Sequence, residues 1–304
     1  MNKEINMKVD LNGLKLKNPI TVASGTFGFG EEYSDFIDLN KLGAISVKGL
    51  TLNPKKGNPP PRIHETPMGM LNSIGLENPG VKVFINEYIP YLRQFDTKII
   101  ANINGRNINE YVKMAEILDK EDIDSIELNI SCPNVKDGGM AFGTNPKVVK
   151  KVVNKVRKAT NHHLIVKLTP NVTDIKEIAK IVQNQGADAI SLINTVAGLS
   201  IDIKKQKPVT KRKVAGLSGP AIKPIAVRKV YEVATEVDIP IIGMGGISNG
   251  KDALEFSLVG ADAISIGTGN FSNPEVSIEV LEYIKKYLSK KGYGKYTEIV
   301  GLIK

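Results

Sequence analysis

The stretch Gly186-Ala-Asp-Ala-Ile-Ser191 recurs without change as Gly260-Ala-Asp-Ala-Ile-Ser265, and Leu42-Gly-Ala-Ile-Ser46 is similar to both. Each copy joins a glycine of the kind that ends a helix to the start of an apolar strand. The repeat therefore indicates that one type of helix-to-strand connection is used several times along the chain.

Short apolar runs bounded by Gly, Asn or Pro also recur along the rest of the sequence. The runs are apolar throughout rather than alternating, which is typical of strands buried on both faces of a parallel sheet. Eight strand–helix units in about 250 residues predict an α/β fold of the (β/α)8 TIM-barrel type. The predicted strands are 20–26, 44–50, 99–104, 125–131, 164–169, 189–194, 240–244 and 263–267, and the predicted helices are 109–118, 146–159, 174–185, 221–237 and 251–259.

A doubly wound open sheet is the competing architecture. It would need a G-x-G-x-x-G motif opening a helix after an early strand, and Gly25-Thr-Phe-Gly-Phe-Gly30 has the wrong spacing. We also predict an N-terminal hairpin over residues 7–17 that turns at Asn12-Gly13 and closes the bottom of the barrel. No linker or shift in composition divides the chain, so we expect residues 1–304 to form a single domain.

Three long connections, 51–80, 133–145 and 197–219, follow the C-terminal ends of predicted strands. In a TIM barrel these ends form the catalytic face. The polar residues at the ends include Lys48 and Lys167, each directly after an apolar run, and lysine is rarely buried without a counter-charge. Together with the neighbouring asparagines they indicate a bound anion; the set is Ser24, Lys48, Asn102, Asn104, Asn129, Cys132, Lys167, Asn194 and Thr195.

The last two units end in the glycine turns Gly243-Met-Gly-Gly-Ile247 and Gly267-Thr-Gly-Asn270. Glycines let backbone N–H groups approach an anion closely, and barrels frequently bind phosphate after strands seven and eight. We therefore expect a phosphorylated ligand, to which Gly216-Leu-Ser-Gly219 contributes.

Asn129-Ile-Ser-Cys-Pro-Asn134 holds the only cysteine of the chain, at the end of a predicted strand. Strand-end loops often carry chemistry, although a lone cysteine is more often a small buried hydrophobe. The only histidines are His64, His162 and His163, and the adjacent pair precedes a strand at the opposite end of the barrel. This arrangement disfavours a Cys/His hydrolase and shows no metal constellation. A phosphate site, two lysines and a thiol without histidine suit a flavin enzyme that uses FMN.

Composition limits the remaining classes. The net charge of +9 is spread over lysine runs without interleaved aromatics, so we expect no nucleic-acid binding, although the charge suits small anions or an acidic partner. One cysteine excludes an internal disulfide, and the sequence has no signal-like segment and no run long enough to span a membrane. We expect a soluble, cytoplasmic protein.

At this point several motifs match one family over nearly the whole chain. The sequence resembles class 1 dihydroorotate dehydrogenase, specifically the catalytic subunit of the NAD-dependent 1B branch. The matching motifs are Ala23-Ser-Gly-Thr26, Ser46-Val-Lys-Gly-Leu50, Met70-Leu-Asn-Ser-Ile-Gly-Leu-Glu-Asn-Pro79, Asn129-Ile-Ser-Cys-Pro-Asn134, Val166-Lys-Leu-Thr-Pro170, Ile193-Asn-Thr195, Gly216-Leu-Ser-Gly-Pro220 and the two glycine turns. The continuation Val135-Lys-Asp-Gly-Gly139 resembles the 1B branch more than the fumarate-using 1A branch.

The resemblance implies a role for each matched position. Cys132 would be the catalytic base. Residues implied to bind FMN are Ser24, Lys48, Gly49, Asn102, Asn129, Lys167, Ile193 and Gly219, with the phosphate on Gly245, Gly246, Gly267 and Thr268. Residues implied to bind the substrate are Lys48, Asn72, Ser73, Ile74, Gly75, Leu76, Asn129, Asn194 and Thr195.

The implied reaction is the oxidation of (S)-dihydroorotate to orotate in de novo pyrimidine (UMP) biosynthesis. Cys132 would take the proton from C5 while FMN N5 takes the hydride from C6, and Lys167 would stabilise negative charge on the reduced flavin. The family passes electrons to NAD⁺ through FAD and a [2Fe–2S] cluster, which needs four ligands, usually cysteines. This chain has one cysteine, so both centres are expected on a partner subunit only. We expect a heterotetramer of two catalytic and two electron-transfer chains around a homodimer.

Other functions stay open at this stage. They are a fumarate-using class 1A dihydroorotate dehydrogenase, another FMN barrel such as a dihydropyrimidine dehydrogenase module or a tRNA dihydrouridine synthase, and a catalytically silent binding subunit. From a different class, a flavin-free barrel lyase or isomerase would use Lys48 or Lys167 as a Schiff-base nucleophile, and the purified protein would be colourless.

Overall fold

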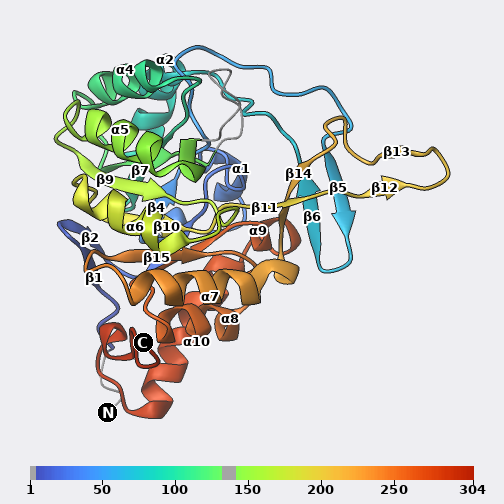
Figure 1. Ribbon diagram of the computed structural model, residues 1–304. Helices are drawn as coiled ribbons and strands as arrows, with labels where there is room; N and C mark the ends of the chain where they lie inside the picture. Colours follow the sequence, from blue (N-terminus) through green and yellow to red (C-terminus); the bar gives the residue numbers. More distant parts are fainter. Residues whose placement is uncertain (1–4, 132–141) are drawn as a thin grey trace.

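Eight parallel strands close into a barrel, as the sequence predicts (Figure 1). The computed structural model describes residues 5–131 and 142–304. Around the barrel the order follows the chain, and the last strand pairs with the first. The strands are β3 (Ile20–Val22), β4 (Ala44–Ser46), β7 (Lys98–Ile103), β8 (Ser125–Asn129), β9 (His163–Lys167), β10 (Ala189–Leu192), β15 (Ile241–Met244) and β16 (Ala263–Ile266).

Except for the strand predicted over 240–244, the predicted strands extend too far at their C-terminal ends. The sequence predicts a strand over 20–26, for example, whereas β3 ends at Val22. The Ala23 N–H still donates to the Ile266 carbonyl of β16 at 2.8 Å, but after it the backbone bonds locally, as where Thr26 N donates to the Ala23 carbonyl. The residues after Ala23 in this prediction, 24–26, are small or polar and belong to the loop at the barrel mouth.

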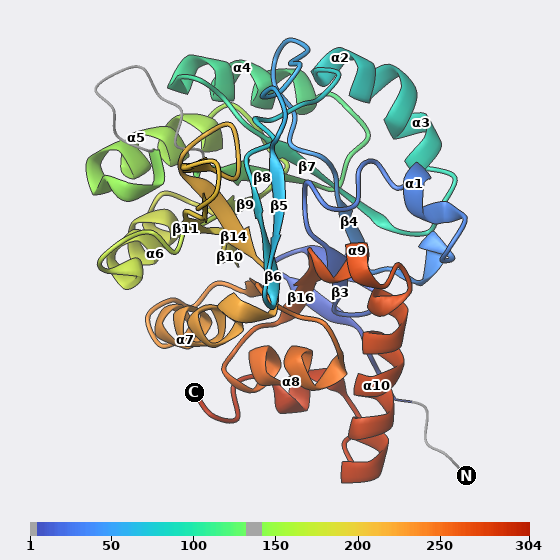
Figure 2. The same cartoon turned by 90° about the vertical axis from the view of Figure 1, so that its right-hand side faces the viewer.

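Helices surround the barrel on its outer face (Figure 2). Four of them begin where the side chain of Asn107, Asn145, Asp174 or Asn249 accepts backbone N–H bonds, a common way of satisfying a helix start. Within residues 5–131 and 142–304, no helix combines the length and the apolar character that crossing a membrane requires. The α-helices are α1 (Glu31–Ser34), α2 (Val81–Val83), α3 (Ile89–Leu92), α4 (Ile108–Leu118), α5 (Pro146–Arg157), α6 (Ile175–Asn184), α7 (Lys223–Ala234), α8 (Gly250–Leu258), α9 (Gly269–Ser272) and α10 (Val276–Lys291). The other helical segments are η1 (Leu39–Lys41), η2 (Phe84–Tyr88), η3 (Phe142–Thr144), η4 (Pro220–Ile222) and η5 (Tyr296–Ile299).

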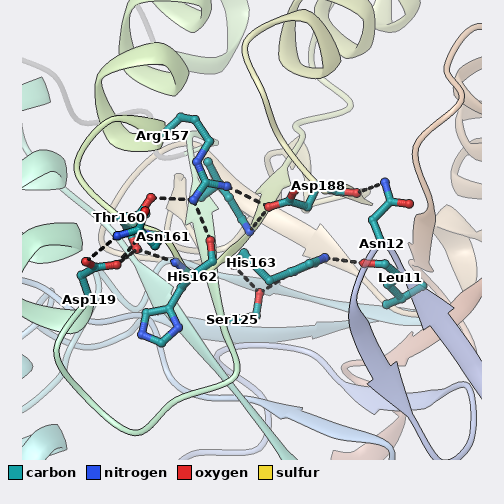
Figure 3. A network of polar contacts seen from close by, with 11 residues as sticks. Leu11, Asn12, Asp119, Ser125, Arg157, Thr160, Asn161, His162, His163 and Asp188 are labelled. Carbon is teal, nitrogen blue, oxygen red and sulfur yellow. Dashed lines mark hydrogen bonds and ion pairs between the residues drawn. The ribbon is translucent and has the colours of Figure 1, made fainter.

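The predicted N-terminal hairpin is present as β1 (Val9–Leu11) and β2 (Leu14–Leu16), turning at Asn12-Gly13. It lies against the N-terminal ends of the barrel strands (Figure 3). His163, the first residue of β9, bonds the Leu11 carbonyl at 2.5 Å through Nε2, and the Asn12 carboxamide donates to the Asp188 carbonyl at 2.9 Å. The hairpin therefore closes the bottom of the barrel.

The long connections after β4 and β10 contain structure that the sequence did not predict. They join in a four-stranded antiparallel sheet with the order β11-β14-β6-β5, which we call the roof sheet. Figure 2 looks onto this sheet, which lies over the barrel strands at their C-terminal ends. Its strands are β5 (Ile63–Thr66), β6 (Gly69–Asn72), β11 (Val196–Gly198) and β14 (Ala215–Ser218), and a separate two-stranded ribbon consists of β12 (Ile201–Asp202) and β13 (Lys207–Pro208).

Candidate active site at the carboxyl end of the barrel

Two lysines predicted to bind ligands lie at the C-terminal ends of their strands. Lys48 follows β4 and is partly exposed, whereas Lys167 ends β9 and is only 4% exposed. No carboxylate among the described residues lies within 4.0 Å of either ammonium group. A buried ammonium without a counter-charge is unfavourable unless a ligand supplies one. The pair therefore indicates an anionic or electron-rich ligand at this end of the barrel.

Carboxamides continue this rim toward β10. Asn129, the last residue of β8, accepts the Ser131 N–H through Oδ1 at 3.1 Å and the Asn194 carboxamide at 3.4 Å. The Oδ1 atom of Asn194 in turn accepts the Thr195 N–H at 2.7 Å. Three residues predicted to bind substrate are thus held in one hydrogen-bonded group.

The roof sheet brings the other predicted substrate segment to the same place. Asn72 is paired in register with Gly216, and its carboxamide donates to the Gly216 carbonyl at 3.4 Å. A Cβ atom at Gly216 would lie 2.3 Å from the Thr195 hydroxyl oxygen, so only glycine fits there. Gly216 therefore joins the segment 72–76 to Thr195, although these parts of the chain are far apart in sequence.

The segment 72–76 itself has an unusual backbone. Gly75 has a φ of 82° and Leu76 a φ of 60°, which is uncommon for a residue with a side chain. The Ser73 hydroxyl is buried and has no hydrogen-bond partner among the described residues. A buried polar group of this kind suits a position that a ligand completes.

The glycine turn after β15 is closely packed. Gly245 and Gly246 have φ values of 128° and 78°, and a Cβ at Gly246 would lie 2.8 Å from the Gly219 carbonyl oxygen. A Cβ at Gly245 would lie 3.2 Å from the side chain of Ile193. Three predicted FMN-binding elements, at 193, 219 and 245–246, are therefore adjacent.

The second glycine turn leads from β16 into α9 and lies beside the loop after β3. A Cβ at Gly267 would lie 3.6 Å from Ala23, the residue before Ser24. Thr268 follows it and directly precedes α9. The predicted positions Ser24, Gly267 and Thr268 are thus brought together next to the first turn, since β15 and β16 are neighbours.

A group of ion pairs around Lys223 lies next to the turn at Gly245 and Gly246. Lys223 Nζ lies 2.8 Å from Asp252 and 2.6 Å from Glu255, and these bonds hold the pKa of Lys223 above its ordinary value. Burial would raise the pKa of Asp252, but bonds from Lys223 and Ser248 outweigh it and the pKa lies below its usual range. Lys223 is therefore occupied by carboxylates, and an anion at the turn would rely on backbone N–H groups.

Sequence reasoning missed one buried polar cluster, which we call the Glu127 cluster: Ser46, Asn102, Asn104, Glu127 and Ser191. Glu127 on β8 is 2% exposed and accepts bonds from Asn102 at 2.5 Å, Ser191 at 2.7 Å and Ser46 at 3.0 Å. The Asn104 carboxamide donates to Asn102 Oδ1 at 2.8 Å. An acidic residue inside an otherwise apolar strand pattern was the available signal; of this cluster, sequence patterns pointed only to Asn102 and Asn104, and the family resemblance gave a role only to Asn102.

The remaining described positions lie in three different parts of the fold. Gly49 packs against the Glu127 cluster, since a Cβ there would lie 2.6 Å from Asn104 Nδ2. His64 lies on β5 of the roof sheet, and His162 and His163 lie at the bottom of the barrel (Figure 3). Cys132 lies outside the described residues, which end at Ser131 before the gap, so its role stays a prediction.

Comparison with known proteins agrees with this geometry. Residues 6–288 match the model of the family described as dihydroorotate dehydrogenase. A protein of Thermoanaerobacter pseudethanolicus named dihydroorotate dehydrogenase B (NAD(+)), catalytic subunit, is 58% identical over 300 residues, covering 99% of each chain. Proteins of the same name are 58% identical in Alkaliphilus oremlandii, over 97% of this chain and 98% of that one, and 51% identical in Lachnoclostridium phytofermentans, over 99% and 100%.

Proposed function

The chain belongs to the dihydroorotate dehydrogenase family, and we propose that it is the catalytic subunit of an NAD⁺-dependent enzyme of the B type. It oxidises (S)-dihydroorotate to orotate in pyrimidine biosynthesis. The structural observation that carries the proposal is the convergence of two lysines without a carboxylate partner among the described residues, an asparagine group and two glycine turns at one end of the barrel. The similarity over 99% of both chains to a protein named as such a subunit supports it.

The family implies a flavin, and the residues at the barrel mouth fit FMN. Asn104 Oδ1 and Ser73 Oγ are buried without hydrogen-bond partners among the described residues, so a ligand can complete them. Lys167 has no carboxylate within 4.0 Å among the described residues, and the backbone of the turn at Gly245 and Gly246 packs so closely on its neighbours that side chains do not fit there. Glycine turns after the last two strands are the usual phosphate site of barrels.

We assign FMN to one side of this rim. Its phosphate is held by the backbone at Gly245, Gly246, Gly267 and Thr268, and its ring system by Ser24, Lys48, Gly49, Asn102, Asn129, Lys167, Ile193 and Gly219. Dihydroorotate lies against Lys48, Asn72, Ser73, Ile74, Gly75, Leu76, Asn129, Asn194 and Thr195. These roles rest on the family resemblance, and the proximity of the described positions supports them.

The oxidation removes two hydrogens from neighbouring carbons of the substrate. Cys132 as a thiolate takes the proton from C5, which is acidified by the adjacent carbonyl, and the electron pair of that bond forms the C5=C6 double bond. Bound FMN supplies the acceptor for the hydride that leaves C6. A thiol has an ordinary pKa of about 8.5 and is only partly ionised at neutral pH, and positive charge beside a thiol increases its thiolate fraction.

Substrate orientation depends on the asparagine group. Carboxamides offer both a donor and an acceptor, which matches the amide and imide edges of dihydroorotate. The bonds of Asn129 and Asn194 to each other and to backbone groups hold these side chains in place before the substrate arrives. Such preorganisation lowers the entropy cost of reaching a reactive geometry.

The word subunit in the relatives' names implies a separate electron-transfer partner. We propose that this partner carries FAD and a [2Fe–2S] cluster, because the present chain contains a single cysteine and a cluster needs four ligands. We further propose that residues 1–304 are one FMN-binding domain, assembled as a homodimer that binds two partner chains.

Steady-state NADH formation tests this proposal. The purified chain should be yellow, release FMN on denaturation, and be bleached by dihydroorotate without oxygen, yet it should reduce NAD⁺ poorly. Adding the partner subunit should restore NADH formation. Full NAD⁺ activity of the isolated chain would refute the two-subunit arrangement, efficient turnover with fumarate would indicate the 1A type, and a colourless protein would favour a flavin-free barrel enzyme.

A further inference from the structure

The Glu127 cluster lies inside the barrel, beneath the predicted flavin site. Glu127 is on β8, whose neighbours in the barrel are β7 and β9. Its carboxyl group nevertheless accepts bonds from Ser46 on β4 and Ser191 on β10, which are each one strand further away on opposite sides. A side chain can reach both only from the interior of the barrel.

Burying a carboxyl group in a barrel core is costly unless donors surround it. Glu127 meets this condition, because Oε2 accepts from Ser46 and Asn102 while Oε1 accepts from Ser191. Three bonds satisfy the group but do not explain why an acid stands here, since the other residues on the same face of β8, Ser125 and Asn129, are uncharged. Unlike an apolar side chain, the Glu127 carboxyl group provides hydrogen-bond acceptors at fixed positions.

The acceptors of Glu127 determine the direction of two carboxamides. Asn102 must turn its Nδ2 toward Glu127, so its Oδ1 points away and accepts from Asn104 Nδ2 at 2.8 Å. The direction of the Asn104 carboxamide is thereby fixed as well. Its Oδ1 lies at the end of the hydrogen-bonded series of Glu127, Asn102 and Asn104 that is furthest from Glu127. That oxygen is buried and has no partner among the described residues.

We propose that Glu127 is a positioning residue, which fixes the direction of the Asn102 and Asn104 carboxamides so that the Asn104 oxygen faces the ligand as an acceptor for an N–H donor. The oxidised isoalloxazine ring of FMN offers one such donor, its N3–H group. The inference rests on the proposed function, because it assigns this donor to FMN. It adds Glu127 and Asn104, to which the family resemblance gave no role.

The proximity of Gly49 supports this placement. A Cβ at Gly49 would lie 2.6 Å from Asn104 Nδ2 and 3.1 Å from Asn102 Oδ1, so the backbone next to Lys48 passes directly over the carboxamide pair. The predicted ligand contacts Lys48 and Gly49 are thus in contact with the outer end of the series. The unpaired oxygen of Asn104 lies beside the proposed flavin site and not in a remote part of the core.

The test compares the binding of FMN and 3-methyl-FMN, which lacks the N3–H donor, to the flavin-free full chain. The parent should bind FMN at least about tenfold more tightly than 3-methyl-FMN, which is the size of effect expected for one buried hydrogen bond. In Glu127→Gln the amide can present either a donor or an acceptor to Asn102, so the carboxamide direction is no longer fixed. The preference for FMN should then fall about fivefold, while the added methyl bulk is the same in both proteins.

Ser191→Ala is the matched control. It removes a bond to the same carboxyl group but leaves the Asn102 and Asn104 series intact, so it should keep the parent preference within about twofold. An unchanged preference in Glu127→Gln would overturn the positioning role while leaving the proposed function in place. A parent chain that binds no FMN would overturn both.

If Glu127→Gln does not fold, Asn104→Ala decides the question, because it removes the acceptor and leaves Glu127 satisfied. The preference for FMN over 3-methyl-FMN should again fall, and retention of the parent preference would refute the inference. Binding is followed by flavin fluorescence, so the readout does not depend on catalysis.

Discussion

Asn129 and Lys167 face each other in the last register pair between β8 and β9. The first belongs to a hydrogen-bonded asparagine group, whereas the second is 4% exposed and has no carboxylate within 4.0 Å among the described residues. Under the proposed function, the counter-charge of the buried Lys167 ammonium is supplied by the ligand.

Replacing Lys167 with Met should weaken FMN binding by about 10- to 100-fold, since a bond to a charged group contributes about 1.5–3 kcal/mol. The flavin-free variant should nevertheless be more stable than the parent, because an unpaired buried charge is removed. Titration with FMN and thermal unfolding without FMN measure the two effects. Lys151→Met, on the exposed face of α5, is the control and should change neither the FMN affinity nor the melting temperature. A flavin-free Lys167→Met variant that is less stable than the parent would contradict this explanation.

Cys132→Ala should retain FMN but slow flavin reduction by dihydroorotate about 10²- to 10⁴-fold at neutral pH, the usual contribution of a positioned base. Cys132→Ser should be nearly as slow near neutrality and recover partly at high pH, because a hydroxyl ionises less readily than a thiol. Anaerobic rapid-mixing absorbance measures the rate. Reduction of the Ala variant at the parent rate would mean that Cys132 is not the base.

Gly246→Ala should abolish most FMN affinity. Its φ of 78° is strained for any side chain, and the new Cβ would also lie 2.8 Å from the Gly219 carbonyl oxygen, so the turn must move. Gly292→Ala separates the two effects, because Gly292 has a φ of 80° with no atom within 4 Å of the Cβ position. Gly292→Ala should lose about 1–2 kcal/mol of stability and Gly246→Ala more, because of the added clash, and only Gly246→Ala should fail in a flavin-binding titration. Equal flavin affinity in the two variants would exclude the turn from the phosphate site.

The bottom of the barrel should make stability depend on pH through His163 (Figure 3). Burial lowers the pKa of His163 below its ordinary value, although the bond to Leu11 opposes the shift. The unfolded chain therefore binds a proton at a higher pH than the folded chain does. The free energy of unfolding should be at its full value above about pH 6.5, the ordinary histidine pKa, and fall as the pH drops below it.

Thermal unfolding between pH 7.5 and pH 5.5 measures this effect. His163→Gln keeps a donor for the Leu11 carbonyl but cannot titrate, so its melting temperature should depend less on pH than that of the parent. His162→Gln should keep the parent dependence, since His162 contacts the Leu118 carbonyl instead. The same pH dependence in all three proteins would refute the role of His163.

The sequence was sufficient to predict the barrel and most of its mouth, because both depend on local patterns. Lys48 and Lys167 could be predicted as rim residues, since each follows an apolar run directly and strand ends meet at one edge. The roof sheet could not, because β6 pairs with β14 from a distant connection, and neither strand has a regular alternation of buried and exposed residues. Glu127 was missed for a related reason: its partners come from three other strands, and no spacing within one strand reveals them.

The roof sheet also limits how this protein can be re-engineered. Its two central strands, β6 and β14, come from separate connections and pair at Met70, Leu71 and Asn72 with Ser218, Leu217 and Gly216. Transplanting only one connection from a relative with another substrate would place two surfaces together that were not selected as a pair. The proposed substrate segment 72–76 therefore depends on both connections, and a loop exchange aimed at new specificity should replace residues 51–80 and 197–219 together.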